Sequence, residues 1–291
     1  MANALVTAII GEKHRNLWQT YARESWQRYA ARHGYEIVLI TQPLDESHFG
    51  KSRHIAWQKL LLFSLPGIER FDRVAWVDSD IIINAEAAPD LFAGVPADKI
   101  GAVPDQALLS SPSLATVFQW LNPAQGPSAA SRARVRAQVS DVPATFDLIV
   151  NTGVLVLSSQ NRQVLEHVYR HHHQTPDSFM EQMALSFEMI SRDLYFPIDP
   201  RFNVLWQEWK FGFYSFVRAF PALGPLCIAS ALGNSFFLHF AGFVDEMKVY
   251  DPSVLVDLNQ ASFPPSLLEK LQGNIDQHRG SAGRGEPPLR A

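Results

Sequence analysis

The sequence predicts an α/β fold in which a mostly parallel sheet is flanked by helices. Three apolar, β-branched runs carry this prediction: "ALVTAII", "YEIVLIT" and "RVAWVDSD". Two stretches with helical apolar spacing separate them, "LWQTYARESWQRYAARHG" and "RHIAWQKLLLFSL". A strand–helix–strand–helix–strand order produces parallel strands with helices on both faces. Gly34 stands where a helix C-cap belongs, and Pro66 and Gly67 end the second helix.

The second half of the chain continues the same pattern. We expect strands over 99–105, 147–159 and 235–242, and helices over 161–174 and 179–192. Residues 107–146, rich in Ser, Ala and Pro, are predicted to form a surface excursion of loop and helix. One domain is expected over 1–273, with a C-terminal helical and loop region. Residues 274–291 are polar and rich in Gly and Pro, so we expect a disordered tail.

Composition restricts the classes of partner. The chain has 291 residues, 47% of them hydrophobic, and a net charge of −4, so no basic footprint for nucleic acid is present. Cys227 is the single cysteine, which excludes an intramolecular disulfide. The N-terminus lacks the pattern of a signal peptide, and we expect a cytoplasmic protein.

The apolar stretch 211–232 is long enough to raise the question of a membrane span. Arg218, Pro221, Gly224 and Pro225 interrupt it. We therefore expect a buried loop–helix unit. A membrane span and a surface that contacts the membrane from the cytoplasm remain alternatives.

Asp78 and Asp80 interrupt the hydrophobic run "DRVAWVDSDIIIN". Bare carboxylates against an apolar core are costly unless a positive charge faces them. Because strand side chains alternate, we expect residues 78 and 80 to point to the same side. Ligands of parallel sheets bind beyond the carboxyl ends of the strands, so the pair is a candidate divalent-cation site. The alternative is two turn residues that end a strand.

Three further patterns are candidates for chemistry. Asn151 and Gly153 interrupt the apolar strand "VNTGVLVLS", which indicates either close approach of a ligand or backbone, or a β-bulge. His239, in "FLHFAG", is either a core histidine or a metal ligand. Glu181 and Gln182 open a helical run, where an acidic residue also fits the helix dipole. The triple "HHH" at 171–173 is not expected to bind metal as a unit, because adjacent helical residues point in different directions.

Taken in order, "RHIAWQKLLLF", "VAWVDSDIIIN", "NTGVLVLSS", "EQMAL" and "LHFAG" resemble the retaining GT-A-fold nucleotide-sugar glycosyltransferases. The resemblance is nearest to glycosyltransferase family 34, the galactosyl, xylosyl and mannosyl transferases, with family 8 close to it. It spans about residues 4–250. It implies a GT-A, Rossmann-like sheet and transfer of a sugar, from a donor that is UDP-linked, to a saccharide or lipid-linked saccharide acceptor.

The resemblance also implies a role for each matching residue. Asp78, Asp80 and His239 would hold Mn²⁺ or Mg²⁺ on the donor diphosphate, and Gln182 and Glu181 would lie at the reacting sugar. The residues implied to contact the donor are Thr7, Ala8, Lys59, Asp78, Ser79, Asn151, Gly153, Gly242 and Lys248. Asp105 would touch sugar hydroxyls of the donor or the acceptor, and we place it with the acceptor contacts. Trp206 and Trp209 are candidates for an acceptor platform, since aromatic faces suit sugar stacking, and the alternative is that they belong to the ordinary core.

Two departures from the family pattern stand out. Glu181 occupies a position where the family often has Asp, and Asp245 stands where a diphosphate-binding lysine is common, so that Lys248 is the first lysine available. A covalent route to retention needs a carboxylate near the anomeric carbon, for which Glu181 is the nominee. Gln182 is an amide and a poor nucleophile. We therefore expect attack from the face that the diphosphate leaves, with the leaving phosphate as base.

Two rival functions remain open. A phosphohydrolase of the haloacid dehalogenase type also places D-x-D after an apolar strand, but that strand usually comes first in the chain. A GT-A-like module that binds a sugar or a partner without catalysis is the second. Intact Asp78, Asp80 and His239 favour the enzyme.

Overall fold

A six-stranded mixed sheet forms the centre of the protein. The computed structural model describes residues 2–104, 149–172 and 181–254. The strand order is β2-β1-β3-β6-β5-β7, in which three neighbouring pairs are parallel and two, both made by β6, are antiparallel. These strands are β1 Asn3–Ala8, β2 Glu36–Ile40, β3 Arg73–Val77, β5 Ile100–Pro104, β6 Val150–Leu157 and β7 Tyr195–Pro197. The predicted α/β class with a mostly parallel sheet is confirmed.

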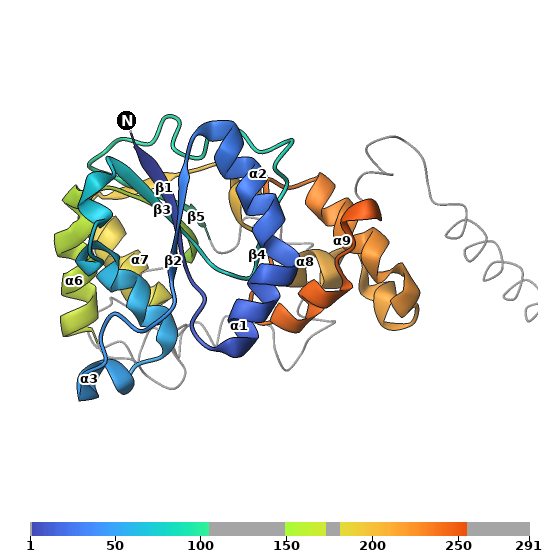
Figure 1. Cartoon of the computed structure of the whole chain (residues 1–291), viewed down its shortest axis with the longest axis horizontal. Coiled ribbons are helices and arrows are strands. Elements are labelled where there is room, and N and C mark those ends of the chain that lie inside the picture. The colour runs from blue at the N-terminus through green and yellow to red at the C-terminus, as the bar shows by residue number, and fades with distance from the viewer. Residues whose placement is uncertain (1, 105–148, 173–180, 255–291) are drawn as a thin grey trace, which may run out of the picture.

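Helices cover both faces of this sheet (Figure 1). The α-helices of the described residues are α1 Glu12–Leu17, α2 Arg23–His33, α3 His48–Lys51, α6 Arg162–His171, α7 Gln182–Ser191, α8 Trp206–Gly212 and α9 Gly224–Gly233. On β3, Ala75 and Val77 pack with the core under α2, whereas Val74 and Trp76 pack with the core under α6 and α7. The period of two along the strand thus divides the hydrophobic core between the two faces.

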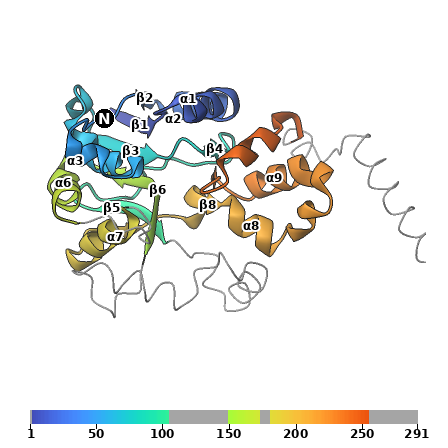
Figure 2. The ribbon, with the colours of Figure 1, turned by 90° about the horizontal axis from the view of Figure 1, so that it is seen from below.

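A second, three-stranded sheet carries the C-terminal part of the chain. Its order is β4-β9-β8, with β4 Ile81–Ile83, β9 Phe237–His239 and β8 Val204–Leu205. Figure 2 shows β4 and β8 between the central sheet and the α8–α9 region. The buried Trp26 of α2 donates its indole N–H to the carbonyl of Ile81 at 2.8 Å, which fixes β4 against the first helix pair.

Several local predictions are confirmed and some need correction. Gly34 ends α2 in the left-handed conformation, at φ 71°. The helix expected around Lys59 is a 3₁₀ helix, Ile55–Ser64. The strand expected to run through Asp80 ends at Val77, so the aspartates lie in the connection between β3 and β4. The reason is that β3 and β4 pair in different sheets, which requires the chain to turn between them.

The apolar stretch 211–232 folds mainly as helix. Cys227, Ile228 and Leu232 of α9 are buried in the core, as predicted, whereas Phe213 and Phe216 are exposed. Within the described ranges no helix combines the length and the apolar character needed to cross a membrane. The surface excursion over 107–146 and the tail over 274–291 lie outside the described residues.

Candidate active site

The three predicted metal ligands meet at the junction of the two sheets. In the small sheet Ile81 pairs with His239, so the residue before Ile81 lies beside the end of β9. His239 Nε2 is 3.3 Å from Asp80 Oδ1 and 3.8 Å from Asp78 Oδ2. The backbone N–H of Phe240 donates to the Asp80 carbonyl at 2.9 Å, which fixes the turn. Asp78 and Asp80 do not lie on a strand, contrary to the prediction, but their carboxylates do face the same atom, His239 Nε2.

Lys59 is the positive charge that faces the first aspartate. Its side chain is 3% exposed, and its Nζ lies 3.2 Å from Asp78 Oδ1 and 2.9 Å from Glu181 Oε1. It also donates to the Thr152 carbonyl at 3.0 Å. Burial acts to lower the pKa of Lys59, but Asp78 and Glu181 raise it more, so the net direction is upward and the ammonium stays charged.

Negative charge exceeds positive charge in this cluster. Asp78, Asp80 and Glu181 supply three carboxylates, and the ion pairs found for them among the described residues come from Lys59 and His239. With a neutral imidazole two negative charges remain without compensation. Asp78 and Asp80 are partly exposed and Glu181 is buried, and a charge imbalance in such surroundings is unfavourable unless a proton or a cation compensates it.

A proton on His239 is one way to reduce the imbalance. Burial acts to lower the pKa of His239, but Asp80 and Asp78 together raise it more, and the net shift is upward. Burial acts to raise the pKa of Asp80, but His239 lowers it more, and the net shift is downward. The imidazole and the carboxylate therefore favour each other's charged forms. A cation at the same point would take the place of that proton.

Asn203 orients His239, a role that no sequence pattern indicated. The backbone N–H of Gly153 donates to Asn151 Oδ1 at 2.9 Å, and Asn203 Nδ2 donates to the same oxygen at 2.8 Å. The side-chain oxygen of Asn203, Oδ1, therefore faces His239 Nδ1 at 2.8 Å and accepts a hydrogen bond from it. In the neutral imidazole Nε2 then carries no proton, and its lone pair is directed at the two aspartates. This arrangement is common in metal-binding histidines.

Gly153 is required because His239 packs directly on the β6 backbone. A Cβ atom at position 153 would lie 2.3 Å from His239 Cε1 and 2.6 Å from Nδ1. The pairing of β5 with β6 also shifts register between Ala102 and Val103, opposite this segment. Both interpretations of the glycine, a close approach and a strand irregularity, therefore hold.

Two residues of the central sheet support Asp78 and Glu181. Trp76 donates its indole N–H to Asp78 Oδ1 at 2.6 Å, and Thr152 donates its hydroxyl to Glu181 Oε1 at 2.7 Å. Sequence reasoning missed both, although Thr152 lies between the two residues of the N-x-G pattern. Glu181 is 1% exposed, and its second oxygen, Oε2, is buried without a protein partner. Gln182, the first residue of α7, is partly exposed.

The other predicted donor contacts lie at the end of β1, in the connection between β3 and β4, and after β9. Thr7 is fully buried near the end of β1, and Ala8 and Ser79 are partly exposed. Gly242 follows β9 in the left-handed conformation, at φ 72°. Lys248 lies 2.9 Å from Asp245, the residue that replaces the expected lysine, and Lys13 of α1 contacts the other oxygen of Asp245 at 2.6 Å.

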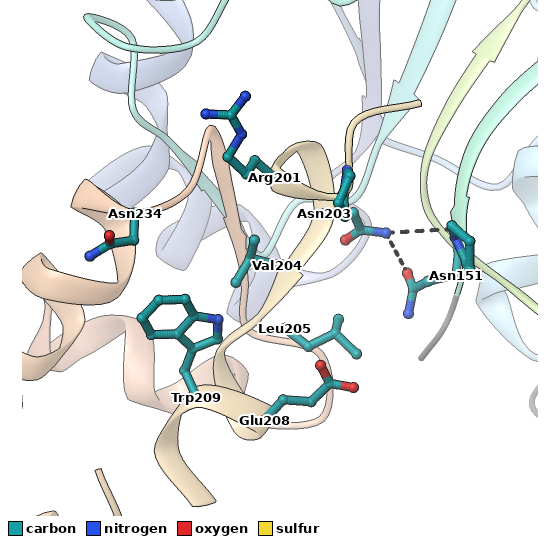
Figure 3. Close-up of a pocket in the computed structure, with 10 residues that line it drawn as sticks. Asn151, Arg201, Asn203, Val204, Leu205, Glu208, Trp209 and Asn234 are labelled. Carbon is teal, nitrogen blue, oxygen red and sulfur yellow. Dashed lines mark hydrogen bonds between the residues drawn. The ribbon is translucent and has the colours of Figure 1, made fainter. Parts of the chain in front are cut away.

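A cavity of about 150 Å³ adjoins the Asn151–Asn203 pair (Figure 3). Trp209, Glu208, Arg201 and Asn234 contribute to its walls, and the indole N–H of Trp209 is buried without a protein partner. Trp206 does not line it. That side chain is 1% exposed, and its indole donates to Glu246 at 2.6 Å. Asp105 lies outside the described residues.

Several solved structures to which the chain is similar are glycosyltransferases. One takes part in glycosylation of the major capsid of PBCV-1: it is 13% identical, with 85% of this chain and 99% of that chain covered and a TM-score of 0.49. The galactosyltransferase LgtC, solved with donor and acceptor sugar analogues, is 12% identical over 92% of this chain and 99% of its own, with a TM-score of 0.44. Mouse xyloside xylosyltransferase 1 is 13% identical over 82% and 97%, with a TM-score of 0.41.

These neighbours belong to the class of enzyme that the sequence resemblance indicated. No family model and no curated protein matches the sequence. Identities and TM-scores this low establish no family and no activity for the chain, so its function has to be inferred from the residues of the site.

The glycine contact generates a prediction about stability. Gly153→Ala should lower the free energy of unfolding by about 1–3 kcal/mol, because the new methyl group and the His239 ring cannot both keep their positions. Urea denaturation followed by circular dichroism measures this. Gly233→Ala is the matched control, since it adds a methyl group in open space on α9. Equal stability of the two variants would show that His239 has room to move.

Proposed function

We propose that the protein is a divalent-metal-dependent glycosyltransferase. It moves a sugar from a nucleotide sugar, UDP-linked in the first instance, to a hydroxyl of a saccharide or glycolipid acceptor with retention of configuration. The observation that carries the proposal is the uncompensated negative charge at Asp78 and Asp80, with an oriented imidazole nitrogen beside it. Carboxylate oxygens with one imidazole suit Mn²⁺, and Mg²⁺ less well.

The metal ligands would be Asp78, Asp80 and His239. A cation held there would act as a Lewis acid on the leaving nucleoside diphosphate. Lys59 forms ion pairs with both Glu181 and Asp78. Its pair with Asp78 would hold this ligand in place. The single positive charge of Lys59 reduces the three negative charges of the cluster to two, which one divalent cation balances.

The contacts of Glu181 favour same-face attack over a covalent intermediate. Its Oε1 accepts from both Lys59 and Thr152, and the side chain is buried. The other oxygen, Oε2, has no protein partner but is buried, so attack on a sugar would require the side chain to move out of its buried position. Gln182 is partly exposed at the start of α7 and is the residue we place at the reacting sugar, as a polar contact rather than a nucleophile.

The cavity beside Asn151 is the proposed acceptor site. It adjoins the orienting pair of His239 and offers one aromatic side chain, Trp209, with polar groups around it (Figure 3). Trp209 lines this cavity and Trp206 does not, so Trp209 is the tryptophan we retain as an acceptor contact. The residues we retain as donor contacts are Asn151, Gly153, Thr7, Ala8, Ser79 and Gly242.

For Lys248 we propose a contact with the donor diphosphate, made after its side chain leaves Asp245. For the exposed Phe213 and Phe216 we propose a contact with a lipid-linked acceptor or the membrane surface.

Donor breakdown tests the proposed reaction. Purified protein is incubated with UDP-glucose, UDP-galactose, UDP-xylose or GDP-mannose, with Mn²⁺ or EDTA, and nucleoside diphosphate release is followed. We expect release from one donor that requires Mn²⁺ and falls at least about 100-fold in Asp80→Asn. Asp98→Asn, an exposed aspartate before β5, is the control and should retain activity.

Other outcomes would support the rival functions. Metal-dependent nucleotide binding without release, with or without acceptors, would indicate a non-catalytic binding module. Phosphate release from sugar phosphates would indicate a phosphohydrolase. Release that is equal with EDTA would contradict the metal role of the aspartates.

The orienting role of Asn203 predicts an effect on metal affinity. Asn203→Leu should weaken Mn²⁺ binding about 10–100-fold, because His239 loses the acceptor that fixes its Nδ1 proton. Electron paramagnetic resonance of free Mn²⁺ measures this. Asn234→Leu makes the same change in another wall of the cavity, where the amide donates to Ser230 of α9, and should leave the affinity unchanged. Equal effects would assign the loss to the cavity rather than to His239.

A further inference from the structure

A second group of metal-ligating side chains lies where α6 ends against α7. His167, His172 and Glu188 each offer a ligand atom, and these atoms lie within 4.8 Å of one another. None of the three belongs to the candidate active site. His172 Nε2 is 2.9 Å and His167 Nε2 is 3.6 Å from the same oxygen, Glu188 Oε1.

The spacing fits a small tetrahedral ion. Zinc bonds to imidazole nitrogen and carboxylate oxygen at about 2.1 Å, which places tetrahedral ligand atoms about 3.4 Å apart. The two distances to Glu188 Oε1 lie on either side of that value. An opening of a few tenths of an ångström at His172 would therefore convert its hydrogen bond into shared coordination.

The two histidine rings meet at the end of α6. The His167 and His172 rings are edge to face, with centroids 6.0 Å apart. His172 caps the helix in the extended conformation, at φ −86° and ψ 144°, so the chain leaves α6 directly after it. Arg53 donates to its carbonyl at 2.7 Å and lies over the ring of Trp57 at 4.2 Å, which holds the cap.

The remaining contacts resemble the support around a metal site. Arg192 donates to Glu188 Oε2 at 2.6 Å, so the other oxygen is directed at the histidines. The His167 ring stacks on His171 with centroids 4.5 Å apart. His172 and Glu188 are buried, and His172 Nδ1 is buried without a protein partner. His167 is 38% exposed, which leaves a path for the ion.

We propose that His167, His172 and Glu188 form a second metal site, which binds Zn²⁺ or a similar borderline transition metal with water in the fourth position. Two imidazoles and one carboxylate favour such metals over Mg²⁺ or Ca²⁺. The site joins the end of α6 to α7, the helix that begins with Gln182. Its role is to brace these helices, and it does not depend on the proposed reaction.

Zinc binding tests the site in the full chain. The Asp80→Asn variant removes a ligand of the first site, and Zn²⁺ binding is then measured by competition with a chromophoric chelator. We expect one equivalent of Zn²⁺ to bind and to raise the melting temperature of the protein. Co²⁺ in place of Zn²⁺ should give the intense visible absorption of tetrahedral coordination. Adding His167→Gln should weaken Zn²⁺ binding at least about tenfold and abolish that absorption.

His48→Gln is the control. His48 is an exposed histidine at the start of α3 and is not one of the three ligating side chains. The change should leave Zn²⁺ affinity within about twofold. Equal loss in His167→Gln and His48→Gln would reveal general binding by surface histidines and overturn the proposal. So would the absence of any Zn²⁺ binding in Asp80→Asn when its circular dichroism spectrum matches that of the unaltered chain.

Discussion

The charge imbalance around Lys59 is the constraint on which the site depends. One buried ammonium is shared by Asp78 and Glu181, while Asp80 faces only His239 among the ion pairs of the described residues. Taking such charges out of water is unfavourable, and a protein retains them where a function requires them. A proton on His239 compensates part of the excess, and a divalent cation would compensate all of it. Three properties are therefore coupled: the metal affinity, the protonation state of His239 and the position of the Lys59 ammonium.

The fold delivers this arrangement through the register of two sheets. Alternation along β3 places Asp78 on the side of Trp76 and Lys59, and the turn into β4 carries Asp80 toward β9. Pairing of Ile81 with His239 then brings a residue from the C-terminal part of the chain to the first aspartates. Gly153 permits the final approach, because any side chain there would occupy the place of the imidazole. The proposed metal ligands come from β9 and from the connection between the two sheets, so neither sheet alone forms the site.

Much of this was predictable from the sequence, and the exceptions have physical reasons. Asp78, Asp80 and His239 could be identified because polar residues interrupt apolar strands, which is a signal on the chain itself. Asn203 lies in a short 3₁₀ segment with no such pattern, and its role depends on contacts with Asn151 and His239, both distant in sequence. The burial of Trp206 depends on Glu246 in the same way. A contact made by tertiary packing leaves no periodic signal.

The location of a bound cation tests the central claim most directly. Crystals grown with Mn²⁺ and UDP would be measured at the manganese absorption edge. The charge imbalance predicts an anomalous peak about 2.0–2.3 Å from His239 Nε2 and from carboxylate oxygens of Asp78 and Asp80, typical distances for such ligands. An empty site at saturating Mn²⁺, with the His239 imidazole still hydrogen-bonded to Asp80, would show that a proton alone satisfies these charges and would contradict the assignment.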